Sequence, residues 1–205
     1  MSTQLKQYIQ ARCSEFAQIP DDRKSILLDV ADFVAQRRRS GNPAKLIFIC
    51  THNSRRSHLS QIWGAVAAEH YGIKGVETYS GGTEATAFNP RAVVALERAG
   101  FEITSTGDTK NPEYHVHGTG DRVLTCFSKR YDDPANPHAD FAAVMTCSDA
   151  DEKCPLVMGS IARIPLRYED PKVADGTPQE AAKYDERCAQ IARELLYAFS
   201  LVKAS

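Results

Sequence analysis

The segment from Cys50 to Ser57 carries residues whose types and spacing could bind and attack an oxyanion. Cys50 follows a short apolar run, and Arg56 comes six residues later, where a helix is predicted to begin. Backbone N–H groups of a loop that enters a helix N-terminus bind anions, and a planar guanidinium can hold two oxygens of one anion. The same positive potential stabilises a thiolate, so we predict that Cys50 is a nucleophile at neutral pH.

The other residues of this loop suit the same chemistry. A Cys followed six residues later by Arg is common by chance, and the position between a strand and a helix makes the pattern specific. Asn53 tolerates positive φ inside a tight loop, Ser57 could donate a hydrogen bond to the Cys50 sulfur, and Arg55 adds positive charge. The predicted oxyanion-binding residues are Thr51, His52, Asn53, Ser54, Arg55, Arg56 and Ser57.

Two further cysteines, Cys147 and Cys154, stand seven residues apart directly after another apolar run. They could exchange a disulfide, with the polar and acidic stretch between them as a mobile loop. They could instead join His115 and His117 in a zinc site, although zinc ligands usually show closer Cys spacing. Burial as two structural cysteines is the third interpretation.

Short apolar runs alternate with segments of helical spacing along most of the chain. Strands are predicted at 46–49, 76–79, 141–145 and 161–166. This alternation predicts an α/β fold with a doubly wound, flavodoxin-like, four-stranded parallel sheet and an active crevice at the carboxyl ends of its strands. Helices are predicted at 57–70, from Asn89-Pro90 to Ala99, and from a capping box at Thr177-Pro178-Gln179-Glu180 onward.

Two regions lack this alternation of strands and helices. Residues 1–43 are predicted to form a helical N-terminal extension that packs on the main domain or on a second copy, which would make a homodimer. The main α/β domain is predicted at 44–205. Within it, residues 105–139 are predicted to be an insertion that holds a β-hairpin around Gly118-Thr119-Gly120-Asp121.

Composition narrows the function classes. The 205 residues include 25 Lys and Arg against 26 Asp and Glu, and this balance argues against a broad nucleic-acid-binding face. No apolar run approaches the roughly 20 residues of a membrane helix, and the start lacks the pattern of a secretory signal, so we expect a cytoplasmic protein without a membrane partner. In that reducing setting, Cys13 and Cys188 are expected to be packing residues. Cys126 could be a further redox thiol or an ordinary buried or exposed cysteine.

Several of these motifs resemble a known family. Cys50–Ser57 is similar to the active-site loop of the low-molecular-weight protein tyrosine phosphatases and of the thioredoxin-coupled arsenate reductases that share their fold. Tyr79–Glu84, Asn89–Ala92 and Thr146–Pro155 are similar to segments of the reductases. The resemblance covers about residues 45–104 and 140–200, and it implies the low-molecular-weight tyrosine phosphatase fold.

The resemblance implies a reaction carried by three thiols. Cys50 would attack arsenate, Cys147 would attack the Cys50 sulfur as arsenite leaves, and Cys154 would take over the disulfide for thioredoxin or a similar dithiol to reduce. Asp170, in the Asp-Pro dipeptide after the last strand, would be the general acid that protonates the leaving oxygen. No metal or organic cofactor is implied.

The alternative function is that of a low-molecular-weight protein tyrosine phosphatase, which hydrolyses phosphomonoesters through a phosphocysteine intermediate. Such phosphatases typically have aromatic residues directly after the Asp-Pro dipeptide, whereas Lys172, Val173 and Ala174 follow here. A non-catalytic oxyanion or metal sensor is a third possibility. The loop also departs from both families, because His52 replaces a usual Gly and Arg55 replaces a usual second Cys.

Overall fold

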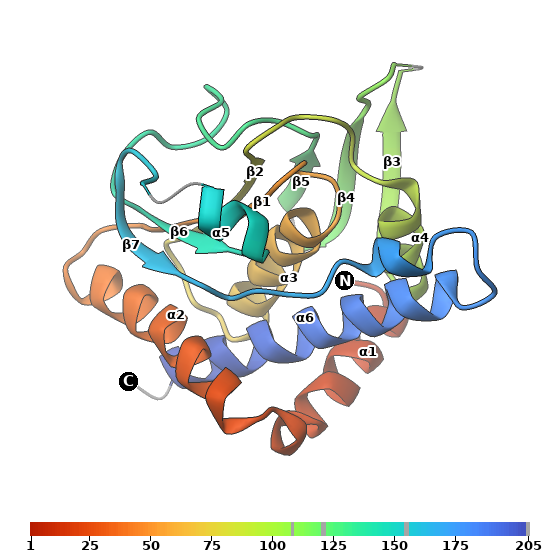
Figure 1. Ribbon diagram of the computed structural model, residues 1–205. Helices are drawn as coiled ribbons and strands as arrows, with labels where there is room; N and C mark the ends of the chain where they lie inside the picture. The colour runs from red at the N-terminus through yellow and green to blue at the C-terminus, as the bar shows by residue number, and fades with distance from the viewer. Residues whose placement is uncertain (108, 120–121, 154–155, 204–205) are drawn as a thin grey trace.

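A four-stranded parallel sheet forms the centre of the molecule (Figure 1). The computed structural model describes residues 1–107, 109–119, 122–153 and 156–203. The strand order is β2-β1-β6-β7, so the chain moves outward from β1 to β2 and returns to the other side of β1. This confirms the predicted doubly wound sheet. Its strands are β1 (Ala44–Cys50), β2 (Val76–Gly82), β6 (Phe141–Met145) and β7 (Ser160–Ile164).

The neighbouring strands β1 and β6 lie where the two directions of winding meet. Doubly wound sheets bind ligands at this point, outside the carboxyl ends of the strands. Cys50 is the last residue of β1, and Cys147 follows the end of β6 by two residues. The topology therefore brings two cysteines that are far apart in the sequence to one edge of the sheet.

Strand β1 is buried on both faces, which explains why its apolar run does not alternate. Leu46 and Phe48 belong to the large core beneath the long helices, whereas Ile47 and Ile49 belong to a smaller core that includes Cys50 and residues of α5. The helices that cover the sheet are α2 (Asp21–Arg39), α3 (Arg56–His70), α5 (Ser148–Lys153) and α6 (Glu180–Lys203).

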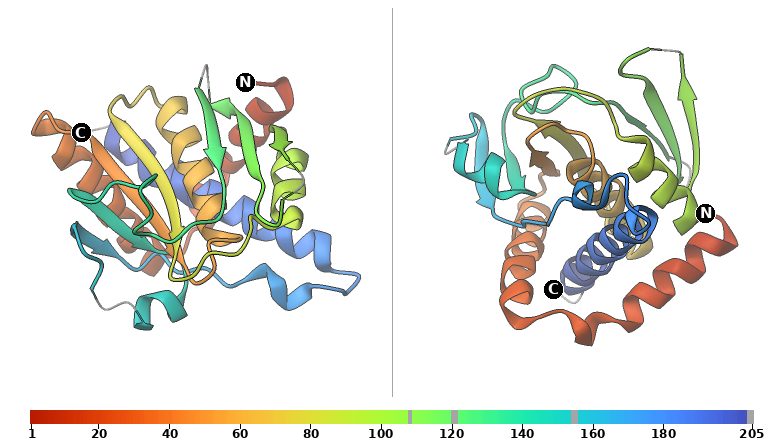
Figure 2. Two further views of the ribbon diagram at one scale, coloured as in Figure 1. Left: turned by 90° about the horizontal axis from the view of Figure 1, so that it is seen from above. Right: turned by 45° about the vertical axis from the view of Figure 1, so that its right-hand side comes forward.

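Helix α6 is the element on which the other helices pack. It contacts α1 (Thr3–Ser14), α2, α3, α4 (Pro90–Ala99) and the 3-10 turn η2 (Pro171–Ala174). Figure 2 shows α1 and α2 arranged around α6, joined by the short 3-10 turn η1 (Phe16–Gln18). The N-terminal helices thus contribute to the same large core as the sheet.

Leu5 of α1 fits closely against two glycines of the main domain. A Cβ atom on Gly100 would lie 2.6 Å from the Leu5 backbone nitrogen, and one on Gly118 would lie 2.9 Å from a Leu5 methyl carbon. Gly100 also ends α4 in the left-handed conformation, directly after the predicted last residue Ala99, and Asn89 caps the start of that helix. The close approach of α1 therefore depends on glycine at both positions.

A second, antiparallel sheet lies beside α3 and α4. Its order is β3-β4-β5, with β3 at Glu102–Thr106, β4 at Glu113–Thr119 and β5 at Arg122–Cys126. The predicted hairpin is present as β4 and β5. Strand β3 is an addition that begins before the predicted insertion boundary at residue 105.

Several predicted boundaries were wrong. Strand β2 continues past its predicted end at residue 79 to Gly82. Gly81 allows close backbone approach there: a Cβ on Gly81 would lie 2.4 Å from the Tyr131 Cα. The predicted mobile loop after Cys147 is helix α5, whose acidic first turn suits the helix dipole. Strand β7 ends at Ile164 because Pro165 cannot continue the ladder, and α6 begins at Glu180 rather than within the capping box.

No described helix is long and apolar enough to cross a membrane.

Candidate active site

The predicted anion-binding loop lies between the end of β1 and the start of α3. Cys50 is nearly buried, and Asn53 has the positive φ (43°) that its residue type favours. In the hydrogen-bond pattern of the described chain, the backbone N–H groups of Thr51 to Arg55 have no acceptor. These donors stand at the N-terminus of a helix, where they can bind an oxyanion.

Asn53 fixes the loop from inside. Its side-chain nitrogen donates to the Ser57 hydroxyl at 2.9 Å, and its side-chain oxygen accepts from the Lys129 backbone N–H at 2.8 Å. Ser57 in turn lies 3.1 Å from the Cys50 sulfur. Because the Ser57 oxygen already accepts from Asn53, its own proton is available for a hydrogen bond to the Cys50 sulfur.

The end of β2 holds the outer side of the loop. The carbonyl of Cys50 accepts from Thr83 N–H at 3.1 Å, and the carbonyl of Thr51 accepts from Glu84 N–H at 2.8 Å. A Cβ on Gly82 would lie 2.7 Å from both the Thr51 oxygen and the Asn53 nitrogen. The loop therefore needs glycine at position 82 to close against β2.

Arg56 links the loop to the predicted general acid. One terminal nitrogen donates to Asp170 Oδ2 at 2.8 Å, and the other donates to the Tyr168 carbonyl at 3.1 Å. The Arg56 Nε is buried and has no partner among the described residues. The second Asp170 oxygen accepts from Lys172 N–H at 3.1 Å, at the start of η2. The structure thus brings Asp170 to the loop that holds Cys50.

The remaining predicted loop residues have different surroundings. The His52 ring is half-exposed and lies 3.7 Å from a Glu84 oxygen, and His52 does not adopt positive φ. Ser54 is buried, and its carbonyl accepts from Asn89 N–H. Arg55 lies 3.7 Å from Asp170 Oδ2 and donates to the Tyr184 hydroxyl at 3.0 Å.

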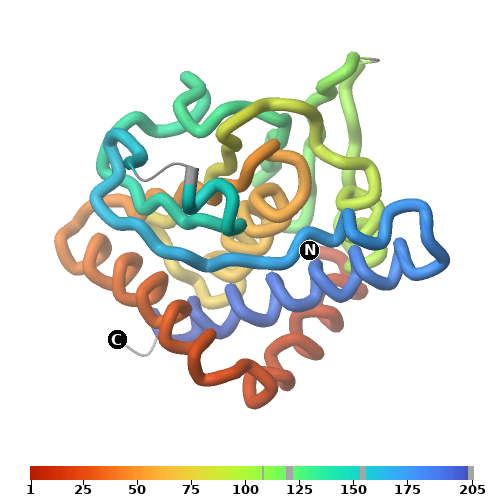
Figure 3. The backbone as a smooth tube through the Cα atoms, in the orientation of Figure 1, coloured from red at the N-terminus to blue at the C-terminus, as the bar shows by residue number. Residues whose placement is uncertain are grey.

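Cys147 also lies against the loop. Its sulfur is 3.5 Å from the Thr51 hydroxyl and accepts from Ala150 N–H at 3.4 Å, in the first turn of α5. Figure 3 follows the chain through the loop after β1, through α5 and through the segment that leads from β7 to α6. The structure brings Cys50 and Cys147 into one small core; Cys154 lies outside the described residues.

Cys13, Cys126 and Cys188 make their side-chain contacts with Tyr71, Gln61 and Trp63, outside the loop. Burial raises the pKa of Cys126 to about 12 and that of Cys188 to about 11, so both remain protonated thiols. Cys188 accepts from the Trp63 indole N–H, and Cys13 contacts the Tyr71 hydroxyl. Burial likewise raises the pKa of Cys13.

The zinc interpretation finds no support in the described part of the chain. His115 and His117 lie in β4 of the second sheet, and His115 contacts Thr125 at 3.4 Å. No group of three or more His, Cys, Asp or Glu side chains that could hold a metal ion occurs among the described residues.

Sequence reasoning missed two residues behind the loop. His58 is fully buried, stacks on Phe88 with ring centroids 4.1 Å apart, and contacts the Ser80 hydroxyl at 3.2 Å. Burial, with the nearby charge of Lys129, lowers the pKa of His58 well below its ordinary value. The helical position directly after Ser57 could have marked His58 as inward-facing, whereas Lys129 sits in an irregular segment without periodicity.

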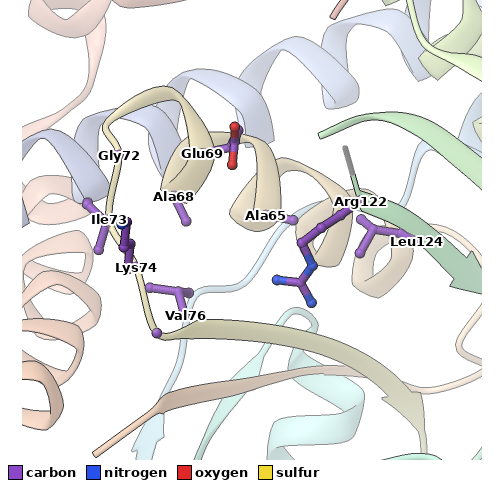
Figure 4. Close-up of a pocket in the computed structure, with 10 residues that line it drawn as sticks. Ala65, Ala68, Glu69, Gly72, Ile73, Lys74, Val76, Arg122 and Leu124 are labelled. Atoms are coloured by element: carbon purple, nitrogen blue, oxygen red, sulfur yellow. The ribbon is translucent and has the colours of Figure 1, made fainter. Parts of the chain in front are cut away.

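A separate cavity of about 370 Å³ lies at the other end of α3 (Figure 4). Glu69, Lys74 and Arg122 line it together with small and apolar residues. Helix α3 has 15 residues, so its two ends are about 20 Å apart at about 1.5 Å per residue. The cavity is therefore distinct from the Cys50 loop, and no cysteine is among the residues that line it.

Sequence comparison relates the chain to known proteins. The family model described as low molecular weight phosphotyrosine protein phosphatase matches residues 45–133. An arsenate reductase of Bacillus licheniformis is 31% identical over 143 residues, which are 69% of this chain and 84% of that protein. An arsenate reductase of Shouchella clausii is 33% identical over 135 residues, 66% of this chain and 79% of that protein.

A solved structure has the same fold. The low-molecular-weight phosphotyrosine phosphatase of Vibrio cholerae O395 superimposes with a TM-score of 0.52 and 11% identity, covering 75% of this chain and 93% of that one. The match to the fold rests on the arrangement of strands and helices, because so few residues are identical.

Proposed function

Because this chain belongs to the arsenate reductases of the low-molecular-weight protein tyrosine phosphatase superfamily, we propose that it reduces arsenate to arsenite through Cys50. One observation favours reduction over hydrolysis. The Cys147 sulfur lies 3.5 Å from the Thr51 hydroxyl, directly beside the loop that carries Cys50. Hydrolysis needs water that attacks phosphorus opposite the Cys50 sulfur, whereas reduction needs a second thiol that can attack the Cys50 sulfur itself.

The first step is the attack of the Cys50 thiolate on arsenic. The N–H groups of the loop and the unpaired Nε of Arg56 would hold the arsenate oxygens. An As–S bond forms and an As–O bond breaks. For this step Asp170 must carry a proton, which it gives to the leaving oxygen as it becomes a carboxylate. The Ser57 hydroxyl stabilises the thiolate before the attack.

The second step transfers two electrons to arsenic. The Cys147 thiolate attacks the Cys50 sulfur, an S–S bond forms, and the As–S bond breaks with its electron pair on arsenic, so that As(V) becomes As(III) and arsenite leaves. In the third step the Cys154 thiolate attacks Cys147 and releases Cys50 as a thiolate. An external dithiol such as thioredoxin then reduces the Cys147–Cys154 disulfide and supplies the two electrons.

Two assays on the purified protein test this function. Arsenate-dependent NADPH oxidation is measured with thioredoxin and thioredoxin reductase, and hydrolysis of an aryl phosphate is measured beside it. We expect arsenate turnover that Cys50→Ser abolishes. Rapid hydrolysis without arsenate-dependent NADPH oxidation would establish the phosphatase alternative instead.

Cys154→Ser tests the relay separately. This variant is expected to release about one arsenite per chain and then stop, because the Cys50–Cys147 disulfide has no internal route to the reductant. Cys188→Ser is the matched control, since Cys188 is buried against Trp63. Full steady-state turnover by the Cys154 variant would contradict the three-thiol relay.

A further inference from the structure

Arg55 occupies the position before α3, and its guanidinium turns toward the acid loop. Its Nη1 lies 3.7 Å from Asp170 Oδ2, and its Nη2 lies 4.0 Å from Asp175 Oδ2. The Arg55 side chain is 15% exposed and that of Asp170 is 13% exposed, so water screens this attraction only in part. Arg56 donates to the same oxygen, so two arginines face one oxygen of Asp170.

Tyr184 fixes the direction of Arg55. Its hydroxyl accepts from Arg55 Nε at 3.0 Å and donates to Asp175 Oδ1 at 2.9 Å. Burial and the Asp175 carboxylate raise the pKa of Tyr184 to about 12, so the hydroxyl keeps its proton at neutral pH. This chain of contacts joins the loop to α6 and holds the guanidinium in one orientation.

We propose that Arg55 is a positioning residue that keeps Asp170 beside the reacting oxygens while Arg56 binds the oxyanion. Arsenate competes with Asp170 for Arg56, and without a second cation the carboxylate would either block that arginine or move away from the negative substrate. Arg55 attracts the same Asp170 oxygen as Arg56 does, so Arg56 can turn its donors to arsenate while Arg55 keeps the acid in place. This inference rests on the proposed function, in which Asp170 protonates the leaving oxygen.

A double-mutant cycle on the affinity for inorganic phosphate tests the coupling without any turnover. The four proteins are the wild type, Arg55→Gln, Asp170→Asn and the double variant, and calorimetry gives the phosphate Kd of each. We expect Arg55→Gln to weaken phosphate binding in the wild type at least about threefold more than in Asp170→Asn, because only the wild type has a competing carboxylate. Equal losses in both backgrounds would overturn the proposal and leave Arg55 as a simple anion-binding charge.

Single-turnover kinetics test the positioning itself. Arg55→Gln is expected to slow arsenite release about tenfold or more and to move the limb of the pH–rate profile that Asp170 controls. Tyr184→Phe should change both in the same direction, and Arg55→Lys should restore part of the rate. Arg98→Gln is the matched control, because Arg98 joins α4 to α6 through Asp185 without touching the loop.

The outcomes separate this proposal from the proposed function. If the wild type does not reduce arsenate, the function is wrong, yet the phosphate cycle still measures the coupling between Arg55 and Asp170. If the wild type reduces arsenate and Arg55→Gln keeps the same rate and pH profile, the function stands and the role of Arg55 is refuted.

Discussion

Asn53 holds the active-site loop with its side chain as well as with its backbone. The positive φ could be predicted from the residue type, because Asn tolerates that region better than most residues. The contact with Lys129 could not be predicted, since it depends on where an irregular segment more than 70 residues away folds back. Local backbone preferences can therefore be predicted from residue types, whereas hydrogen bonds between residues far apart in the sequence cannot.

Gly82→Ala tests the closure of the loop at this scale. The new Cβ would lie 2.2 Å from the Glu84 oxygen and 2.7 Å from the Asn53 nitrogen, so the loop must shift. We expect phosphate affinity and the rate of arsenate reduction to fall by about a hundredfold or more, because a displacement of catalytic groups by about 1 Å can cause a loss of that size.

Gly41→Ala is the control for Gly82→Ala. Gly41 has positive φ (70°), and a Cβ there meets nothing within 4 Å. Gly41→Ala should lower the free energy of unfolding by about 1 kcal/mol and leave activity unchanged. A Gly82 variant with normal phosphate affinity would show that the loop does not depend on this close approach.

Helix α5 determines where the second thiol lies. Its first turn donates Ala150 N–H to Cys147, and its Asp151 carboxylate accepts from Arg163 and Arg167 of the β7 region. The sequence predicted a loop here, because a segment of six residues with Ala150 as its one apolar member has too little periodicity to indicate a helix. Strand β3 was missed for a related reason: most of its side chains are exposed, so it has no apolar pattern.

Asp151→Ala tests this anchoring. Loss of the two arginine contacts should raise hydrogen exchange at the α5 amides about tenfold or more and slow arsenite release in the first turnover. Phosphate affinity should not change, since the loop that binds the oxyanion keeps its contacts. Asp149→Ala is the control, because Asp149 is exposed on the same helix. Unchanged exchange in the Asp151 variant would show that other contacts fix α5.

At the scale of the whole molecule, the parallel sheet could be predicted because buried strands need continuous apolar runs. The packing of the N-terminal helices could not be predicted. An amphipathic helix indicates that its apolar face is covered, but not which element covers it. In the structure this face packs on α6 and the sheet. The division of the chain into an N-terminal extension and a main domain therefore remains a prediction. In the structure, residues of both regions belong to one hydrophobic core.

The response of global stability to pH is expected to depend on His58. Its pKa in the folded protein is lowered by burial, whereas in the unfolded chain it is near 6.5. Below that pH the unfolded state binds a proton that the folded state excludes, so stability is complete above about pH 6.5 and falls as the pH decreases. The loss is at most about 1.4 kcal/mol per pH unit.

His58→Gln removes this contribution and keeps a polar side chain. Thermal unfolding of both proteins is measured between pH 8 and pH 5. The Tm of the wild type should fall more steeply on acidification than that of the variant. Parallel curves would show that His58 accepts a proton in the folded protein without penalty.

The central position of α6 has a consequence for synthesis of the chain on the ribosome. Helices α1 to α4 and the switch point of the sheet are made first, but they share a core with a helix that begins at Glu180. At about 5–20 residues per second, α2 waits on the order of ten seconds for that partner. During this time the parts of α2 and α3 that pack on α6 have nothing to cover them. A nascent chain of this protein is therefore expected to recruit chaperones until α6 emerges, and to fold in one late step.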